Sequence, residues 1–196
     1  MSGRPDDDTI AQALEAIGDQ NLVFVGLMGA GKSVIGRLIA QWLSIPFADS
    51  DHEIEKVSRM SITELFAAYG EEEFRSLEAR VIGRLLKTGP RVISTGGGAF
   101  MNTETRELIA EEGLSIWLKA DLEVLWERVS RRDTRPLLRT DDPKGTLKAL
   151  LEQRYPIYEQ AKVTVVSRDA AKEVVARDVI SALAQLVKSE KQEPIA

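Results

Sequence analysis

The chain has 196 residues, of which 43% are hydrophobic, so its size and composition fit one globular domain with a sizeable core. It carries 26 basic and 31 acidic residues, and the resulting net charge of −5 argues against a general nucleic-acid-binding surface. There is no cysteine, no apolar run long enough for a membrane span and no N-terminal signal sequence, so we expect a cytoplasmic protein without disulfides.

The first predicted element is a short helix over residues 9–18, whose apolar residues fall on one face: Ile10, Leu14 and Ile17. It precedes the first predicted strand. We therefore interpret residues 1–20 as an N-terminal extension, partly disordered, that packs on a domain spanning residues 21–188. The tail, residues 189–196, is polar and charged and is expected to be loose.

Short apolar runs then alternate with segments of helical periodicity. The runs predicted as strands are 22–25, 45–48, 92–93, 114–118 and 163–166. The segments predicted as helices are 32–43, 61–68, 72–87, 103–112, 121–131, 145–160 and 170–187. Five β runs alternating with helices predict an α/β fold, in which a five-stranded parallel sheet is flanked by helices on both faces. Ligands in such folds bind at the carboxyl ends of the strands.

Residues 26–33, GLMGAGKS, follow the first strand and match the phosphate-loop pattern in full. Glycines let such a loop turn its N–H groups inward, and the helix that follows adds its positive N-terminal end. Lys32 can reach the β- and γ-phosphates, and the Ser33 hydroxyl can ligate Mg²⁺. The alternative is a glycine-rich turn with an incidental lysine, but an accidental match has a chance on the order of 1%. We predict that the loop binds a nucleoside triphosphate, expected to be ATP.

Two further strand ends carry candidate residues. Asp49-Ser50-Asp51 follows the second strand, where one carboxylate could face a metal shell and the other a substrate hydroxyl. Taken alone, this tripeptide is more often a helix cap, and the nearby phosphate loop reverses that preference. Residues 95–98, TGGG, follow the third strand and favour close approach of a ligand to the backbone. The lack of a metal-binding Asp here argues against the usual GTPase and motor patterns.

Arginines are candidates for anion binding. Arg75 and Glu78 form an i,i+3 pair for which a surface salt bridge is the default, and Arg154 has the alternative of a solvated helix residue. As a pair, Arg75 and Arg154 would clamp a carboxylate, because the guanidinium fork matches that group. A further cluster of arginines predicts a mobile basic lid over about 132–144, which would exclude water: Arg128, Arg131, Arg132 and Arg135.

Together, these motifs resemble those of shikimate kinases. The shared stretches are GLMGAGKS, DSDHEIE, FRSLE, STGGGAF, RPLL and RYPIY, in the family's order over residues 21–188. The resemblance implies a small three-layer phosphate-loop kinase with a substrate-binding region at about 50–80 and a lid. It also implies transfer of the γ-phosphoryl group of ATP to the 3-hydroxyl of shikimate. The products would be shikimate 3-phosphate and ADP, on the route to chorismate and the aromatic amino acids.

The resemblance also assigns roles to individual residues. Catalytic roles are expected for Lys32, Asp51 and Arg135. The residues expected to bind ATP are Gly29, Ala30, Gly31, Lys32, Ser33, Val34, Arg128, which would stack on adenine, and Arg135. The residues expected to bind shikimate are Asp51, Phe66, Phe74, Arg75, Glu78, Gly97, Gly98 and Arg154. Mg²⁺ is expected to contact Ser33 and, through water, Asp49.

Some alternatives stay open. Asp51 would either remove the proton from the attacking hydroxyl or only orient it, because a loose transition state needs little help from a base. The chain could instead be a related kinase acting on gluconate or a nucleotide, or a nucleotide-binding module without catalysis. A GTPase is less favoured because the N-K-x-D guanine signature is absent. We expect a monomer whose partners are ATP, shikimate and Mg²⁺.

Overall fold

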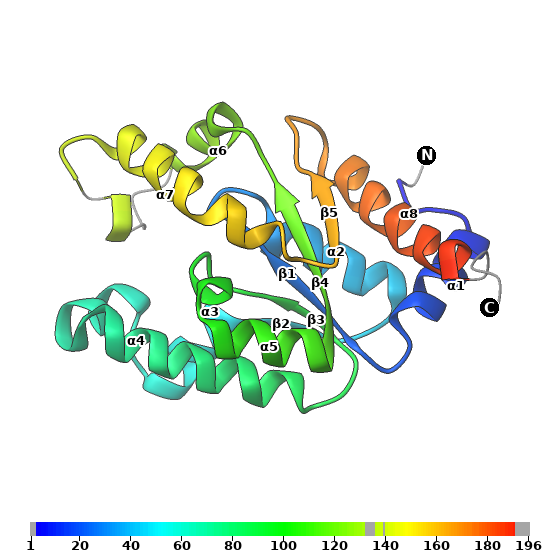
Figure 1. Cartoon of the computed structure of the whole chain (residues 1–196), viewed down its shortest axis with the longest axis horizontal. Helices are drawn as coiled ribbons and strands as arrows, with labels where there is room; N and C mark the ends of the chain where they lie inside the picture. Colours follow the sequence, from blue (N-terminus) through cyan, green and yellow to red (C-terminus); the bar gives the residue numbers. More distant parts are fainter. Residues whose placement is uncertain (1–2, 132–135, 139, 191–196) are drawn as a thin grey trace.

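The computed structural model describes residues 3–131, 136–138 and 140–190. At its centre is a five-stranded sheet in the order β2-β3-β1-β4-β5, and every pair of neighbouring strands is parallel (Figure 1). The strands are β1 Asn21–Val25, β2 Phe47–Asp49, β3 Val92–Ser94, β4 Gly113–Lys119 and β5 Val163–Val166. The predicted α/β class and its five-stranded parallel sheet are therefore confirmed.

Strand burial follows position in the sheet. All five residues of the central strand β1 are buried, whereas the edge strand β5 alternates buried and exposed residues. Central strands of parallel sheets are covered on both faces, so their sequences are continuous apolar runs. This explains why residues 22–25, LVFV, could be predicted as a strand. The register pairs Phe24 of β1 with Ser94 of β3, and Ser94 with Asp49 of β2. Three strands therefore end at the same level.

Helices form a layer on each face of the sheet (Figure 1). On one face lie α2, Lys32–Leu43, and α8, Lys172–Glu190, with α1, Asp7–Ile17, packed on α8. On the other face lie α4, Ile62–Leu86, α5, Thr103–Glu112, and α7, Pro143–Tyr158. The remaining elements are α3, Ser50–Ser58, α6, Leu122–Val129, and two 3₁₀ turns, η1 Ala99–Met101 and η2 Pro136–Leu138. None of the described helices is long and apolar enough to cross a membrane.

The structure departs from the expected elements at the second strand, near the site. This strand begins at Phe47 rather than at residue 45, and it is followed by helix α3, which the sequence indicated only through the helix-cap interpretation of Asp49-Ser50-Asp51. Only Ser50 and Ile54 of α3 are buried, so its sequence carries little apolar periodicity. The helices predicted at 61–68 and 72–87 are the two halves of α4, separated by Gly70, whose φ of 79° and ψ of 178° are not helical.

The N-terminal helix α1 is part of the packed structure. Its buried residues are Ile10, Ala13 and Ile17, whereas Leu14, which was expected on the buried face, is 37% exposed. The buried residues therefore follow i, i+3 and i+7 spacing along one face of the helix. Helix α1 packs on α8. The Asp6 carboxylate caps α1 by accepting a hydrogen bond of 2.8 Å from the Thr9 backbone N–H.

We predict that Ile17→Ala lowers the free energy of unfolding by about 2–4 kcal/mol, because it leaves a cavity between α1 and α8. The matched variant Leu14→Ala should change it by less than about 1 kcal/mol, since that side chain is already in contact with water. Urea unfolding monitored by tryptophan fluorescence measures both. Equal and small effects would show that α1 contributes nothing to the core.

Candidate active site

The phosphate loop (residues 26–33) leaves the carboxyl end of β1 and enters α2 at Lys32. Gly29 and Gly31 have φ of 84° and 95°, in the left-handed region that favours glycine. A Cβ on Gly29 would also lie 2.9 Å from the Val129 side chain, so the loop is packed closely against α6. The turn that the glycines predicted is therefore present, and the first residues of α2, Lys32 and Ser33, line a cavity.

Lys32 lies across its own loop. The side chain is largely buried, and its Nζ donates hydrogen bonds of 2.7 Å to the Gly26 carbonyl and 3.0 Å to the Leu27 carbonyl. Both acceptors are neutral backbone groups. An anion placed in the loop would therefore be a stronger acceptor for this ammonium group.

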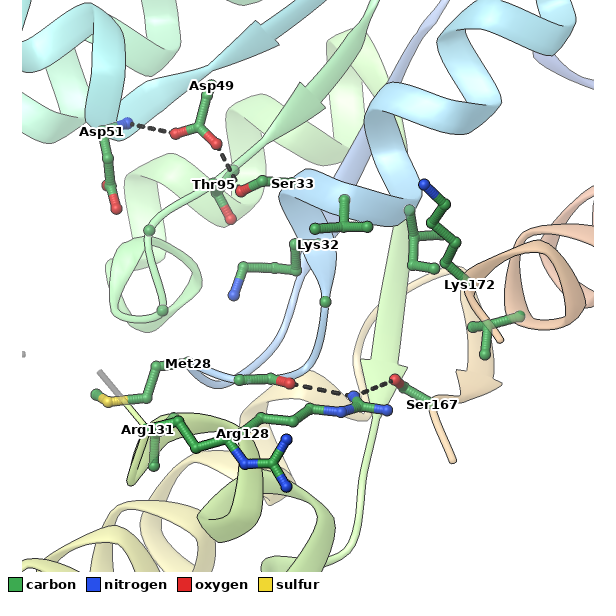
Figure 2. Close-up of a pocket in the computed structure, with 18 of the residues that line it drawn as sticks. Met28, Lys32, Ser33, Asp49, Asp51, Thr95, Arg128, Arg131, Ser167 and Lys172 are labelled. Atoms are coloured by element: carbon green, nitrogen blue, oxygen red, sulfur yellow. Dashed lines mark hydrogen bonds between the residues drawn. The ribbon is translucent and has the colours of Figure 1, made fainter. Parts of the chain in front are cut away.

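Asp49 has two functions at the end of β2. Its Oδ1 accepts from the Asp51 backbone N–H at 3.1 Å and caps α3, while its Oδ2 accepts from the Ser33 hydroxyl at 2.6 Å (Figure 2). The Ser33 and Ser94 hydroxyl oxygens lie 3.0 Å apart. The helix-cap interpretation of Asp49-Ser50-Asp51 is therefore correct, and the other oxygen of Asp49 contacts Ser33 beside the phosphate loop.

The oxygens of Ser33 and Asp49 fit a magnesium site. Mg²⁺ prefers hard oxygen ligands and usually takes one or two from the protein, with waters and phosphates completing the octahedron. A hydroxyl and a carboxylate already in contact offer such a pair beside the phosphate loop. Across the described residues there is no group of three or more His, Cys, Asp or Glu side chains that could hold a metal ion.

The phosphate loop opens into a cavity of about 470 Å³, which we call the loop cavity. The predicted residues that line it are Gly29, Gly31, Lys32, Ser33, Val34, Asp49, Asp51 and Arg128 (Figure 2). The predicted Ala30 does not line it, because its side chain is buried beneath the loop. Lining residues that the sequence analysis did not assign to a site include Ser167 and Ala170 after β5, and Lys172 and Val175 at the start of α8.

Arg128 lines the loop cavity near the end of α6, and it is held by three hydrogen bonds. Its Nη1 donates to the Gly29 carbonyl at 3.1 Å and to the Ser167 hydroxyl at 3.0 Å, and its Nη2 donates to the Arg168 carbonyl at 2.7 Å. The guanidinium plane is therefore fixed between the phosphate loop and the segment after β5. Arg131, one turn further on, also lines the cavity and pairs with Glu127 at 2.6 Å.

A second cavity, of about 360 Å³, lies beyond Asp51, and we call it the arginine cavity. All eight residues expected to bind shikimate line it: Asp51, Phe66, Phe74, Arg75, Glu78, Gly97, Gly98 and Arg154. Lining residues not expected from the sequence are Met28, Glu55, Ser61, Ile62, Thr63, Gly96 and Leu137. The two cavities share Met28, Asp51, Gly96 and Gly97. Asp51 therefore stands where the phosphate-loop side meets the arginine side.

The pair of Arg75 and Glu78 is not the surface salt bridge that its spacing suggested. Glu78 is 2% exposed, and its Oε2 accepts a hydrogen bond of 2.7 Å from Arg75 Nη1. Arg75 also contacts the exposed Glu71 at 3.0 Å. Burial raises the pKa of Glu78, the Arg75 guanidinium opposes that rise, and Asp51 adds to it. The arginine is thus held in place by a carboxylate that is itself removed from water.

Arg154 is likewise buried rather than solvated. It is 7% exposed, and its Nη1 donates to the Gly97 carbonyl at 2.9 Å. The Tyr158 hydroxyl donates to the same carbonyl, and burial raises the pKa of that phenol. Gly97 O therefore accepts two hydrogen bonds from α7, which fixes the glycine-rich turn against that helix.

The glycines after β3 make room for charged side chains of the protein itself. A Cβ on Gly96 would lie 2.3 Å from Glu78 Oε1 and 2.9 Å from Asp51 Oδ1. A Cβ on Gly98 would lie 2.4 Å from the Arg75 guanidinium carbon. In the structure it is these side chains that approach the glycine backbone closely, and the close approach of a ligand stays a prediction. No larger residue fits at either position unless they move.

Two phenylalanines form the apolar wall of the arginine cavity. The Phe66 and Phe74 rings are 4.6 Å apart between centroids, and Phe74 is buried. The Arg75 guanidinium carbon lies 5.1 Å from the Phe74 ring centre, close enough for a cation–π contact. Arg135, expected to act on the phosphates from the lid, lies outside the described residues. Leu137 of η2 does line the cavity.

Comparisons with known proteins point to one family. The model of the family described as shikimate kinase matches residues 28–184. The shikimate kinase of Rhizobium leguminosarum bv. trifolii (strain WSM2304) is 61% identical over 185 residues, which cover 92% of this chain and 94% of that protein. The solved structure of the shikimate kinase from Acinetobacter baumannii in complex with shikimate has a TM-score of 0.84 and 34% identity, covering 92% of this chain and 99% of that chain.

A gluconokinase from Sinorhizobium meliloti 1021 gives a TM-score of 0.58 at 22% identity, covering 90% of this chain and 98% of that chain. A likeness at that level shows the common fold alone. The family match spans most of the sequence, and the relative from Rhizobium is similar almost end to end. The chain therefore belongs to the shikimate kinase family.

Proposed function

We propose that the protein transfers the γ-phosphoryl group of ATP to the 3-hydroxyl of shikimate, giving shikimate 3-phosphate and ADP. The observation that carries the proposal is the junction of the two cavities at Asp51. A phosphate loop opens on one side of this carboxylate, and the partly buried Arg75 and the buried Arg154 lie on the other. Phosphoryl transfer needs alignment of two substrates and neutralisation of charge more than it needs covalent chemistry from the protein.

On the acceptor side, Arg75 and Arg154 would bind the shikimate carboxylate. Both guanidinium groups line the arginine cavity, and both are largely removed from water, which strengthens a charge-assisted hydrogen bond. Glu78, which is itself buried, orients Arg75 through their hydrogen-bonded ion pair. Phe66 and Phe74 would cover the ring of the acid. The Gly97 and Gly98 backbone would complete the pocket.

On the donor side, the inward N–H groups of the phosphate loop and the N-terminal end of α2 would hold the triphosphate. Lys32 would exchange its backbone acceptors for the β- and γ-phosphates. Ser33, and Asp49 through water, would hold Mg²⁺, which neutralises phosphate charge when it is bound. Arg128 would flank the adenine, and Arg135 would approach the phosphates from the lid.

Asp51 would receive the 3-hydroxyl at the junction of the two cavities. Asp51 lies near Glu78, and the repulsion between the two carboxylates raises the pKa of Glu78. The Asp51 carboxylate would accept the hydrogen bond from the hydroxyl and point the oxygen lone pair toward the γ-phosphorus. Both a general base and an orienting group are compatible with a loose transition state.

We further propose that the enzyme acts as a monomer in the cytoplasm, with residues 21–188 as its catalytic domain. Light scattering after gel filtration tests the oligomeric state.

An ADP-release assay with shikimate, gluconate and nucleoside monophosphates tests the acceptor. ADP release that depends on gluconate instead of shikimate would overturn the proposed function.

Asp51→Asn is expected to lower kcat by at least about 100-fold, because an amide can neither take up the proton nor attract it as strongly. ADP affinity, measured by titration calorimetry, should stay near that of the wild type, since the phosphate loop is unchanged. A wild-type kcat in this variant would remove Asp51 from the mechanism.

Arg75→Lys is expected to raise KM for shikimate by about tenfold or more, because a lysine cannot present the two-pronged donor to a carboxylate. KM for ATP should change little. Arg80→Lys is the matched control, since Arg80 is exposed on the same helix and lines neither cavity. Steady-state kinetics with each substrate varied in turn would compare the two variants. If both had the same KM for shikimate, Arg75 would not bind the shikimate carboxylate.

Ser33→Ala should raise the Mg²⁺ concentration needed for half-maximal turnover by roughly tenfold, because it removes one hard oxygen ligand. Ser115→Ala, which removes a buried serine hydroxyl in β4 that lines neither cavity, is the control and should leave the Mg²⁺ requirement unchanged. The measurement is an ADP-release assay at a series of Mg²⁺ concentrations. Superimposable activation curves for the two variants would exclude Ser33 as a ligand.

A further inference from the structure

A loop that turns its N–H groups inward turns its carbonyl groups outward, and those carbonyls need donors from elsewhere in the protein. In this chain the Gly29 carbonyl accepts from Arg128 at 3.1 Å, and the Ala30 carbonyl accepts from the Ser167 hydroxyl at 2.8 Å. Neither donor belongs to the loop. The outer side of the phosphate loop is therefore held by α6 and by the segment after β5.

Ser167 is the residue that joins these contacts. Its hydroxyl accepts a hydrogen bond of 3.0 Å from Arg128 Nη1 (Figure 2). The same hydroxyl donates to Ala30 O, so both its donor and an acceptor site are used. Its backbone N–H donates to Lys119 O at 2.7 Å, which fixes it to the end of β4. It is 2% exposed. One small side chain thus connects β5, α6 and the phosphate loop.

The Ala30 carbonyl matters because the peptide unit is planar. Its oxygen and the N–H of Gly31 point in opposite directions from the same plane. Gly31 has a φ of 95° and lacks a Cβ, so little local resistance opposes rotation of that plane. A donor fixed on the Ala30 oxygen therefore sets the direction of the Gly31 N–H, which lies in the turn that would face the phosphates.

We propose that Ser167 is a positioning residue for ATP: its hydroxyl fixes the Ala30–Gly31 peptide so that the Gly31 N–H faces the nucleotide. The proposal rests on the proposed assignment of the loop cavity to ATP. Ser167 acts through the loop backbone, and it is a different residue from those assigned to ATP by sequence. Its loss is expected to weaken nucleotide binding without altering the arginine cavity, which it does not line.

The decisive comparison is Ser167→Thr against Ser167→Val, because the two side chains have nearly the same shape and only threonine keeps the hydroxyl. Valine, and likewise Ser167→Ala, should raise KM for ATP and the Kd for ADP by about tenfold, the loss expected for one hydrogen bond at the phosphates. Threonine should restore both constants. KM for shikimate should stay within about twofold in every variant, since the hydrogen bond that is lost lies on the nucleotide side.

Ser115→Ala is the control for the loss of a buried serine hydroxyl as such. Ser115 lies in β4, is 7% exposed, accepts a 2.9 Å hydrogen bond from the Lys162 N–H and lines neither cavity. Its removal should lower the Tm and leave the Kd for ADP unchanged. If Ser167→Ala does the same, Ser167 is a structural residue and the proposal is overturned.

Lys32→Met distinguishes a failure of this proposal from a failure of the proposed function. If Lys32→Met weakens ATP binding while Ser167→Ala does not, the loop cavity is the nucleotide site and only the role of Ser167 is wrong. If Lys32→Met leaves nucleotide affinity unchanged, the assignment of the cavity itself fails. Should the valine variant not fold, the alanine and threonine variants decide the question by the same titrations.

Discussion

The register of three parallel strands determines where the chemistry of this protein can take place. Because Asp49, Ser94 and Phe24 lie side by side, the segments that leave β2, β3 and β1 start at the same level of the sheet. The phosphate loop, the cap of α3 and the glycine turn are therefore neighbours, although they are far apart in the sequence. A slip of one residue in β2 would turn Asp49 to the opposite face and separate its carboxylate from Ser33.

The arginine side of the site is built around a carboxylate that water does not reach. An acid as deeply buried as Glu78 is costly unless cations compensate it, and Arg75 and Arg154 both contribute to that compensation. The same cations line the cavity, so the interactions that stabilise the acid also hold the arginines ready for an incoming anion. Little side-chain freedom then remains to be lost on binding, which is the physical meaning of preorganisation.

The parts of the molecule that could be predicted from sequence are those specified by local rules. The phosphate loop and the buried run of β1 were identified because glycine geometry and strand burial leave a direct pattern. Helix α3 was indicated only by its cap because Val57 is exposed and Ile54 is its one buried large apolar residue. The burial of Glu78 was missed since it depends on how α4 packs against the glycine turn.

The same reasoning explains which lining residues were not found. Ser167 and Lys172 are ordinary polar residues in sequence, and they reach the loop cavity through the packing of β5 and α8. Thr63 and Glu55 reach the arginine cavity through the turn between α3 and α4. Spacing along the chain carries no information about such long-range contacts, whereas the phosphate loop can be identified because all of its members lie within eight consecutive residues.

The crowding at the glycine turn bears on how acceptor preference could be redesigned. Gly96 and Gly98 face Glu78 and Arg75 so closely that neither can gain a side chain while those partners stay in place. A substitution at either glycine therefore requires the ends of the Glu78, Asp51 or Arg75 side chains to leave their present positions. Other lining residues, Ile62, Thr63 and Phe66, are only partly buried, and they are the first positions to vary when the acceptor preference is redesigned.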